Sequence, residues 1–247
     1  MKFSAEALVI REMNVGENDR LLTLLTKEQG VIKAFASGVK NYKSKKSAGT
    51  SLLSYSNFLL EQKGDTYRVR EVSPIKVFFG VGDDIKKLAL SQYFCELALV
   101  LAPMDCESVE FLRLILNSLH FLSSGDKNVN LLKAITELKI SALSGYSPEL
   151  VACEDCGTFE DDLMFFGLAD GSLWCNACKP EGNFRPLNKT MLYAMRHVLF
   201  SPLEKIYSFS VPDDCAAALS KITEEYLIIQ TEHKFATLDF YNSIPED

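Results

Sequence analysis

The sequence contains no run of about 18 consecutive apolar residues, the length at which a segment becomes a candidate membrane span. Residues 1–10 carry one lysine and lack the apolar core of a secretory signal peptide. We therefore expect a chain of a reducing compartment in which cysteines stay as thiols. Hydrophobic residues make up 47% of its 247 residues, enough to fill a sizeable core.

The usual sequence marks of catalysis are missing as well. Gly80-Val81-Gly82 has neither a third glycine nor a following Lys-Ser/Thr pair, so it is interpreted as a linker rather than a phosphate-binding loop. The three histidines, His120, His197 and His233, do not stand in the H-x-E pattern of zinc deaminases. No nucleophile stands at a recognisable spacing from a base. The sequence therefore predicts a protein that is not an enzyme.

Four cysteines form the strongest local motif. Cys153 and Cys156 make one C-x-x-C pair, and Cys175 and Cys178 make a second pair after 18 intervening residues. Each pair can supply two thiolates at one corner of a tetrahedron, and the four match the ligands of a structural zinc site. Asp170-Gly171 stands between apolar runs and predicts a β-hairpin that returns the second pair to the first. The sequence therefore predicts one structural Zn²⁺ held by all four cysteines.

Other uses of these cysteines fit less well. Two disulfides would require an oxidising compartment, and a thioredoxin-like site needs one C-x-x-C pair rather than two. A catalytic zinc would keep one coordination position open, whereas four cysteines close the shell. A redox switch, in which oxidation releases the metal, is a further hypothesis. Cys95, Cys106 and Cys215 stand in apolar segments and are expected to be buried.

The pattern of apolar residues changes near residue 80. Before it, turn signals separate five predicted strands, at 7–11, 20–25, 31–36, 56–61 and 66–70. Five strands in this length predict a small closed barrel, most commonly of the oligonucleotide/oligosaccharide-binding (OB) type, although 20–28 also fits a helix. After it, helical spacing predicts amphipathic helices at 90–101, 112–122, 131–142, 191–199 and 219–229.

The predicted fold class is thus α+β and multidomain. An N-terminal five-stranded OB-type barrel at 1–80 would bind nucleic acid, and an all-helical domain would occupy 81–247. The Cys₄ zinc hairpin, at 150–182, would be an insertion into the helical domain.

Charge is distributed unevenly between these two parts. The whole chain has a net charge of −7. Residues 1–80 carry 13 lysines and arginines against 8 aspartates and glutamates, whereas 81–247 carry 13 against 25. A basic part can meet phosphates and an acidic part cannot do so over most of its surface. We therefore expect any nucleic acid to bind the barrel.

The most basic segment is the loop at 38–47, in which four lysines surround Tyr42. Lysines on such a loop can follow a phosphate backbone, and a tyrosine can stack on a base. A solvated, flexible loop without function is the other interpretation. Because side chains alternate along a strand, the predicted barrel strands also place cations and one aromatic residue on the outer face. The predicted DNA-binding residues are Arg11, Arg20, Lys33, Phe35, Lys40, Tyr42, Lys43, Lys45, Lys46, Arg68 and Arg70.

Together these features resemble the RecO family of bacterial DNA repair and recombination proteins, over essentially the full chain. The resemblance rests on the order and spacing of several segments. These are Ala7-Leu8-Val9-Ile10, Gly16-Glu17-Asn18-Asp19-Arg20-Leu21, the basic loop at 38–46, Gly145-Tyr146-Ser147-Pro148-Glu149-Leu150 before the first cysteine pair, the second pair, and Leu238-Asp239-Phe240-Tyr241.

The resemblance implies an N-terminal OB domain, a helical domain, a zinc-binding insertion and a cytoplasmic, nucleoid-associated protein. It implies binding to single- and double-stranded DNA and annealing of complementary strands. It also implies displacement of the single-stranded DNA-binding protein SSB so that RecA can load, usually together with RecR, and contact with the acidic C-terminal tail of SSB. Some members lack the cysteines, whereas this chain has all four.

Scattered basic residues are the only candidates for a site that takes the SSB tail. They are Arg113, Lys133, Lys139 and Arg196. The alternative function is a zinc-containing scaffold for protein interactions, in which the acidic helical domain works without direct DNA binding.

Overall fold

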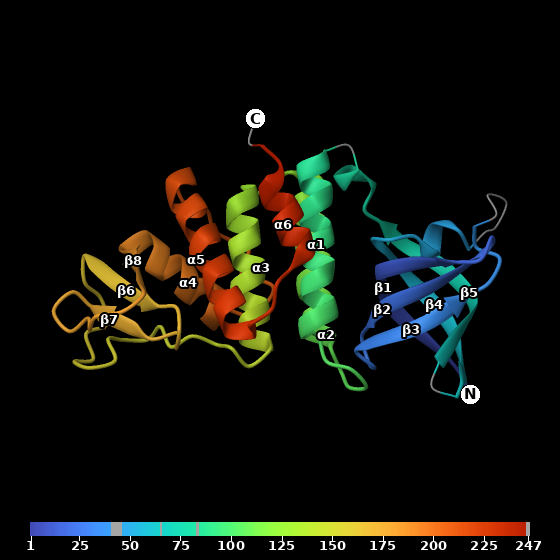
Figure 1. The fold of residues 1–247 in the computed structure, drawn as a ribbon, viewed down its shortest axis with the longest axis horizontal. Helices are drawn as coiled ribbons and strands as arrows, with labels where there is room; N and C mark the ends of the chain where they lie inside the picture. The colour runs from blue at the N-terminus through green and yellow to red at the C-terminus, as the bar shows by residue number, and fades with distance from the viewer. Residues whose placement is uncertain (41–45, 65, 83, 246–247) are drawn as a thin grey trace. The chain divides into compact units, whose positions relative to one another are not determined.

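A computed structural model describes residues 1–40, 46–64, 66–82 and 84–245 (Figure 1). The chain divides into two compact units, Met1–Ser124 with Phe235–Asp247, and Gly125–Lys234. The predicted domain ranges, 1–80 and 81–247 with an insertion at 150–182, follow the sequence pattern rather than compactness and stay a prediction. Among the described residues, no helix is both long and apolar enough to cross a membrane.

The first unit begins with a closed five-stranded barrel (Figure 1). Its strands are β1 (Lys2–Val15), β2 (Asp19–Thr26), β3 (Val31–Ala36), β4 (Ser54–Lys63) and β5 (Thr66–Val77). They follow the order β1-β2-β3-β5-β4, and only the β3–β5 pair is parallel. This is the five-stranded barrel that the sequence predicts, and the helical alternative for 20–28 is wrong.

Alternation of side chains explains why these segments form a barrel. Val9 on β1, Leu22 and Leu24 on β2, and Phe58 and Leu60 on β4 point into the interior and are at most 1% exposed. Their neighbours in the sequence point outward, because successive side chains on a strand face opposite sides. The interior is therefore filled by apolar side chains, and the charged residues of the strands lie on the outer surface.

Six helices follow the barrel in the part of the chain that the structure describes. They are α1 (Ile85–Leu101), α2 (Val109–Ser124), α3 (Val129–Leu143), α4 (Lys189–Phe200), α5 (Asp213–Thr231) and α6 (Ala236–Ser243). The five predicted helices are all present. Asp84 caps α1 by accepting from the backbone N–H groups of Lys86 and Lys87 at 2.8 and 3.1 Å.

Three features of the first unit differ from the sequence predictions or add to them. The short helix α6, which lies beside α1 (Figure 1), was not predicted. Cys106 is exposed rather than buried, because it lies in the loop between α1 and α2 and not in a helix. The segment interpreted as a linker packs closely, since a Cβ added to Gly80 would lie 2.6 Å from the side chain of Ser123.

The second unit adds a small antiparallel sheet to helices α3, α4 and α5. Its strands are β6 (Leu163–Gly167), β7 (Leu173–Cys175) and β8 (Phe184–Asn188). The order is β7-β6-β8, so β6 is central. The β6–β7 pair is the hairpin that Asp170-Gly171 predicts, whereas β8 was not predicted.

Candidate metal centre and nucleic-acid surface

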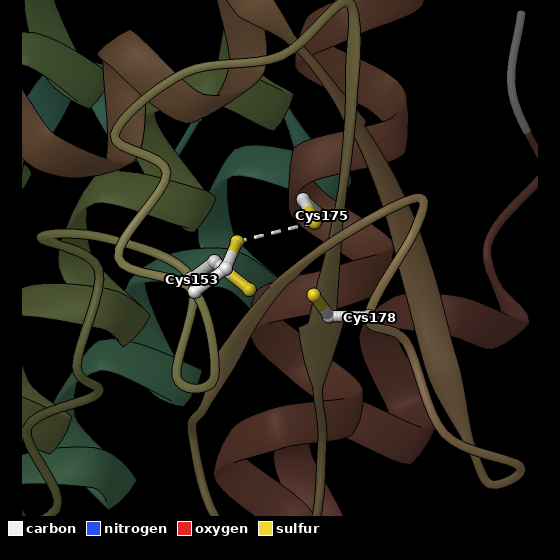
Figure 2. Close-up of side chains that lie close together, drawn as sticks. Cys153, Cys175 and Cys178 are labelled. Atoms are coloured by element: carbon white, nitrogen blue, oxygen red, sulfur yellow. Dashed lines mark hydrogen bonds between the residues drawn. The ribbon is translucent and has the colours of Figure 1, made fainter.

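Four sulfur atoms meet at one place in the second unit. The Sγ atoms of Cys153, Cys156, Cys175 and Cys178 all lie within 4.8 Å of one another, and those of Cys156 and Cys175 are 3.7 Å apart. In a tetrahedral site with Zn–S bonds of about 2.3 Å, two sulfur ligands stand about 3.8 Å apart. Figure 2 shows the side chains of Cys153, Cys175 and Cys178 gathered in one place. The spacing of the two pairs thus led to the right cluster.

Two equivalent turns present the sulfur atoms. The N–H of Gly157 donates to the carbonyl of Cys153 at 3.0 Å, and the N–H of Lys179 donates to the carbonyl of Cys175 at 3.1 Å. Gly157 has φ +70°, a conformation that glycine adopts without strain. The N–H of Glu154 donates to the carbonyl of Leu173 on β7 at 2.8 Å. This last bond ties the first turn to the strand that carries the second pair.

The hairpin between the pairs is fixed by local hydrogen bonds. The Asp170 carboxylate accepts from the backbone N–H of Ser172 at 3.0 Å and from its hydroxyl at 2.6 Å, which lowers the pKa of Asp170. Gly171 has φ +72°, and an added Cβ would lie 3.0 Å from Cα of Pro148. The register places Met164 of β6 opposite Cys175. The turn therefore determines where the second cysteine pair lies.

The electrostatic surroundings of the thiols suit a metal cation. Donation from the hydroxyl and the backbone N–H of Thr158 lowers the pKa of Cys156 to about 6. The pKa of Cys178 is raised by its hydrogen bond with Asp155 and by its cysteine neighbours. Four adjacent thiols resist ionising together, because each thiolate disfavours the next. A divalent cation removes that penalty, so this all-thiolate donor set fits Zn²⁺.

A second candidate surface lies on the outside of the barrel. Phe35 of β3 stands opposite Arg68 of β5, and Lys33 occupies the same face of β3 two residues earlier. Lys33 and Arg68 are exposed and Phe35 is half-buried. Neither cation forms an ion pair with the residues that the structure describes. An aromatic ring between two cations on neighbouring strands is an arrangement that binds single-stranded nucleic acid.

The other predicted DNA-binding residues lie in varied surroundings. Arg11 is exposed on β1, opposite Thr23, which in turn is opposite Lys33. Lys40 is exposed, and Lys46 is half-buried. Three further predicted residues lie outside the described part of the chain. These are Tyr42, Lys43 and Lys45.

Two of the predicted arginines are held by carboxylates. Arg70 forms an ion pair with Glu61, with a distance of 2.8 Å from Nε to Oε2, and this partner lowers the pKa of Glu61. Arg20 lies 3.3 Å from the carboxylate of Glu12, and its side chain is only 16% exposed. Strand register brings these charges together, and a phosphate would compete with the carboxylates for both arginines.

Sequence reasoning missed an apolar groove in the second unit. Val151, Phe159, Tyr193 and Phe200 line a hollow of about 550 Å³, and each is between 48 and 61% exposed. Large apolar side chains at outward positions of α4 are the signal that could have indicated it. Exposed apolar side chains gathered around one hollow make it a candidate surface for another molecule.

Arg196 forms the base of this groove. Its guanidinium group lies 3.9 Å from the centre of the Phe159 ring and donates to the carbonyls of Leu150, Val151 and Phe159 at 2.7, 2.9 and 2.6 Å. Arg196 is 6% exposed, and its Nη1 has no hydrogen-bond partner among the described residues. The groove thus combines exposed aromatic rings with a buried cation that has an unused donor.

The remaining basic candidates are placed differently. Lys133 is buried between the carboxylates of Glu137 and Glu224, both at 2.7 Å. The Nζ of Lys139 donates to the carbonyl of Leu199 at 3.3 Å. Arg113 is exposed on α2, in the first unit. Of the four candidates, only Arg196 lines the apolar groove.

Comparison with known proteins finds one family over both parts of the chain. Residues 1–78 match the family model described as "Recombination protein O N terminal", and residues 82–239 match "Recombination protein O C terminal". A DNA repair protein RecO of Acetivibrio thermocellus is 28% identical over 238 residues, which cover 96% of this chain and 95% of that protein. A RecO of Desulfitobacterium hafniense is 32% identical over 209 residues, covering 83% and 76%. A RecO of Alkaliphilus metalliredigens is 26% identical over 246 residues, covering 99% and 100%.

Proposed function

The chain belongs to the RecO family of DNA repair proteins, and from this premise we propose that it works as a recombination mediator without catalysis. In this role it anneals complementary single strands and helps RecA to load onto DNA coated with SSB. The observation that carries the proposal is the group of Lys33, Phe35 and Arg68 on adjacent strands of an OB-type barrel.

The charge and chemistry of this group suit annealing. Lysine and arginine neutralise backbone phosphates, and an aromatic ring stacks on any base, so binding of this kind does not depend on sequence. Base edges that the protein leaves free can still pair. Two strands held in this way approach each other with less repulsion than free strands, and pairing becomes faster.

We assign a structural role to the four-cysteine cluster, with one Zn²⁺ per chain. Bound metal would supply a cross-link between the two C-x-x-C turns. Cys153, Cys156, Cys175 and Cys178 would close the coordination shell and leave no position for a substrate. The residues around the cluster would then keep β6 and β7 folded against the first turn.

The apolar groove is the surface that we propose for the SSB tail. An acidic peptide with apolar side chains needs rings to pack against and a cation to meet a carboxylate. Tyr193 and Phe200 offer the first, and the positive charge of Arg196, which lines the groove, offers the second. RecR is a further proposed partner, to which we assign no surface.

Binding of a fluorescent single strand over a salt series tests the DNA proposal. Neutralising about five phosphates should give a log–log slope of the binding constant near −3.5. Lys33→Ala or Arg68→Ala should each reduce the slope by about 0.7, and the paired variant should also slow annealing of complementary strands. Glu17→Gln, in an exposed turn, is the control for a general change of charge.

Absence of binding at low salt would contradict the DNA proposal. The scaffold function would then lead, with the exposed groove around Phe200 as its supporting observation.

A labelled acidic peptide with a free C-terminus tests the groove. Phe200→Ala and Tyr193→Ala should each weaken binding by about tenfold, as truncation of an interface anchor does. Phe240→Ala changes an equally exposed aromatic residue in the other unit and is the matched control. Equal affinity for all three variants would exclude this groove.

A further inference from the structure

The turn between β1 and β2 holds one flank of the basic loop. The carboxylate of Asp19 accepts from the backbone N–H of Gly38 at 2.8 Å. The N–H of Lys40 donates to the carbonyl of Asn18 at 3.1 Å. These bonds fix the chain on the N-terminal side of the loop, up to the last residue that is described there.

Arg20 and Glu12 hold the other flank. The Nη1 of Arg20 lies 3.3 Å from the carboxylate of Glu12 and 3.4 Å from both the carbonyl of Thr50 and the hydroxyl of Ser51. The same Glu12 oxygen accepts from the backbone N–H of Leu52 at 3.0 Å. Arg20 and Glu12 therefore join the strands of the barrel to residues 50–52.

The segment held in this way is ordered by its own side chains. The hydroxyl of Thr50 donates to the carbonyl of Lys46 at 2.9 Å, and that of Ser54 donates to the carbonyl of Ala48 at 2.6 Å. Gly49 is buried against β5, where an added Cβ would lie 2.7 Å from the side chain of Val72. Because this segment is compact, fixing residues 50–52 also fixes the backbone of Lys46.

We propose that Arg20 is a positioning residue, which with Glu12 and Asp19 sets the backbone at Lys40 and at Lys46 and does not itself bind phosphate. Its Nε is buried, and its Nη1 contacts Glu12 of the barrel together with Thr50 and Ser51. The inference rests on the proposed DNA binding. It gives a physical role to Asn18, Asp19 and Arg20, which belong to one of the segments that carried the family resemblance.

Replacing Glu12 distinguishes a phosphate-binding Arg20 from a positioning Arg20, because the two roles predict opposite changes in DNA affinity. If Arg20 binds phosphate, Glu12→Ala releases it, removes a negative charge, and should tighten binding. If Arg20 positions the segment that carries Lys46, Glu12→Ala should weaken binding by about fivefold, the worth of about one hydrogen bond. Glu17→Gln removes one carboxylate from the neighbouring turn and should not weaken binding. Tighter binding by Glu12→Ala would overturn the proposal.

The salt dependence of Arg20→Gln gives an independent readout. A positioning residue lowers the affinity and leaves the log–log slope unchanged, whereas loss of a phosphate contact on a single strand reduces the slope by about 0.7. Lys33→Ala is the reference for such a reduction. A reduced slope for Arg20→Gln would overturn the proposal.

Hydrogen exchange without DNA distinguishes failure of this inference from failure of the proposed function. Amides at 46–53 should exchange faster in Glu12→Ala and Arg20→Gln than in the wild type, and Glu17→Gln should match the wild type. Unchanged exchange would refute the positioning role, whether or not the protein binds DNA. Faster exchange in a protein that binds no DNA would leave the positioning role standing and contradict the proposed function.

Discussion

The Nζ atom of Lys133 lies 2.7 Å from Oε1 of Glu137, one turn further along α3, and neither side chain is more than 1% exposed. Glu224 of α5 contributes a second carboxylate at 2.7 Å from the same Nζ. Thr223 donates to the other oxygen of Glu137 at 2.7 Å. Burial raises the pKa of Glu137 although Lys133 and Thr223 oppose the shift. This group thus links α3 to α5, and each buried charge in it is stabilised by the others.

Removing the lysine should therefore be costly. Lys133→Met leaves Glu137 as a buried carboxylate without its cation, and we expect a loss of about 3–5 kcal/mol in the free energy of unfolding. Urea denaturation followed by circular dichroism measures it. In Lys133→Met/Glu137→Leu the fully buried pair is gone and only the partly exposed Glu224 keeps its charge, so most of the stability should return. A double variant as unstable as the single one would show that packing, rather than charge, sets the cost.

Gly30 should resist replacement much more than another glycine of similar backbone conformation. It has φ +64°, and a Cβ added to it would lie 2.0 Å from the carbonyl oxygen of Pro103, which accepts from the N–H of Val31 at 2.9 Å. Gly16 has φ +60° with open space around it. Gly16→Ala should cost about 1–2 kcal/mol from backbone strain alone. Gly30→Ala should cost clearly more in the same denaturation experiment, and equal costs would contradict the close approach.

The sequence was most informative where structure depends on neighbouring residues. Strand alternation and turn signals predicted the barrel, and Asp170-Gly171 predicted the hairpin that brings Cys175 to Cys153. Helix α6 was missed because its start depends on a distant residue. The N–H groups of Ala236 and Thr237 donate to the carboxylate of Glu96 at 3.3 and 2.9 Å. No local pattern shows a cap that is supplied from about 140 residues away.

The same limit applies to the candidate DNA-binding surface. In the sequence, Arg20, Arg70 and Arg68 look alike, as exposed cations on strands. Glu12 on the neighbouring strand pairs with Arg20. Register places Glu61 directly opposite Arg68, but the Glu61 carboxylate is bonded to Arg70, and Arg68 forms no ion pair among the described residues. Register is a property of paired strands, so charge counts along one strand could not separate these arginines. The apolar groove was missed for a related reason, since it forms only where Tyr193 and Phe200 of α4 lie beside Val151 and Phe159, which are distant in the sequence.

Tyr226 should make the second unit sensitive to alkali. It is 2% exposed, its hydroxyl donates to the carbonyl of Tyr146 at 3.1 Å, and burial raises its pKa from 10.0 to about 12. Between these values the unfolded chain loses the proton first, so stability is full below pH 10 and falls as the pH rises toward 12. The loss reaches about 3 kcal/mol above pH 12 and about half of that at pH 11. Urea denaturation at pH 9 and 11 should show it.

Tyr226→Phe should remove this part of the loss of stability at alkaline pH, although the variant also lacks one hydrogen bond at every pH. Tyr146→Phe alters an exposed tyrosine in the same region and should keep the wild-type pH dependence. An unchanged alkaline loss in Tyr226→Phe would show that another group causes it.

Loss of one cysteine should empty the four-cysteine cluster of metal. Purified protein should contain about one zinc per chain by elemental analysis, and Cys175→Ser should contain none, because three thiolates and a buried hydroxyl no longer close the shell. Binding energy of a structural metal is folding energy, so amides around β6 and β7 should lose protection against hydrogen exchange in this variant. A chelator added to the wild type should produce the same loss. Cys106→Ser removes an exposed cysteine outside the cluster and is the control. If Cys175→Ser keeps one zinc and melts normally, the cluster does not hold the insertion together.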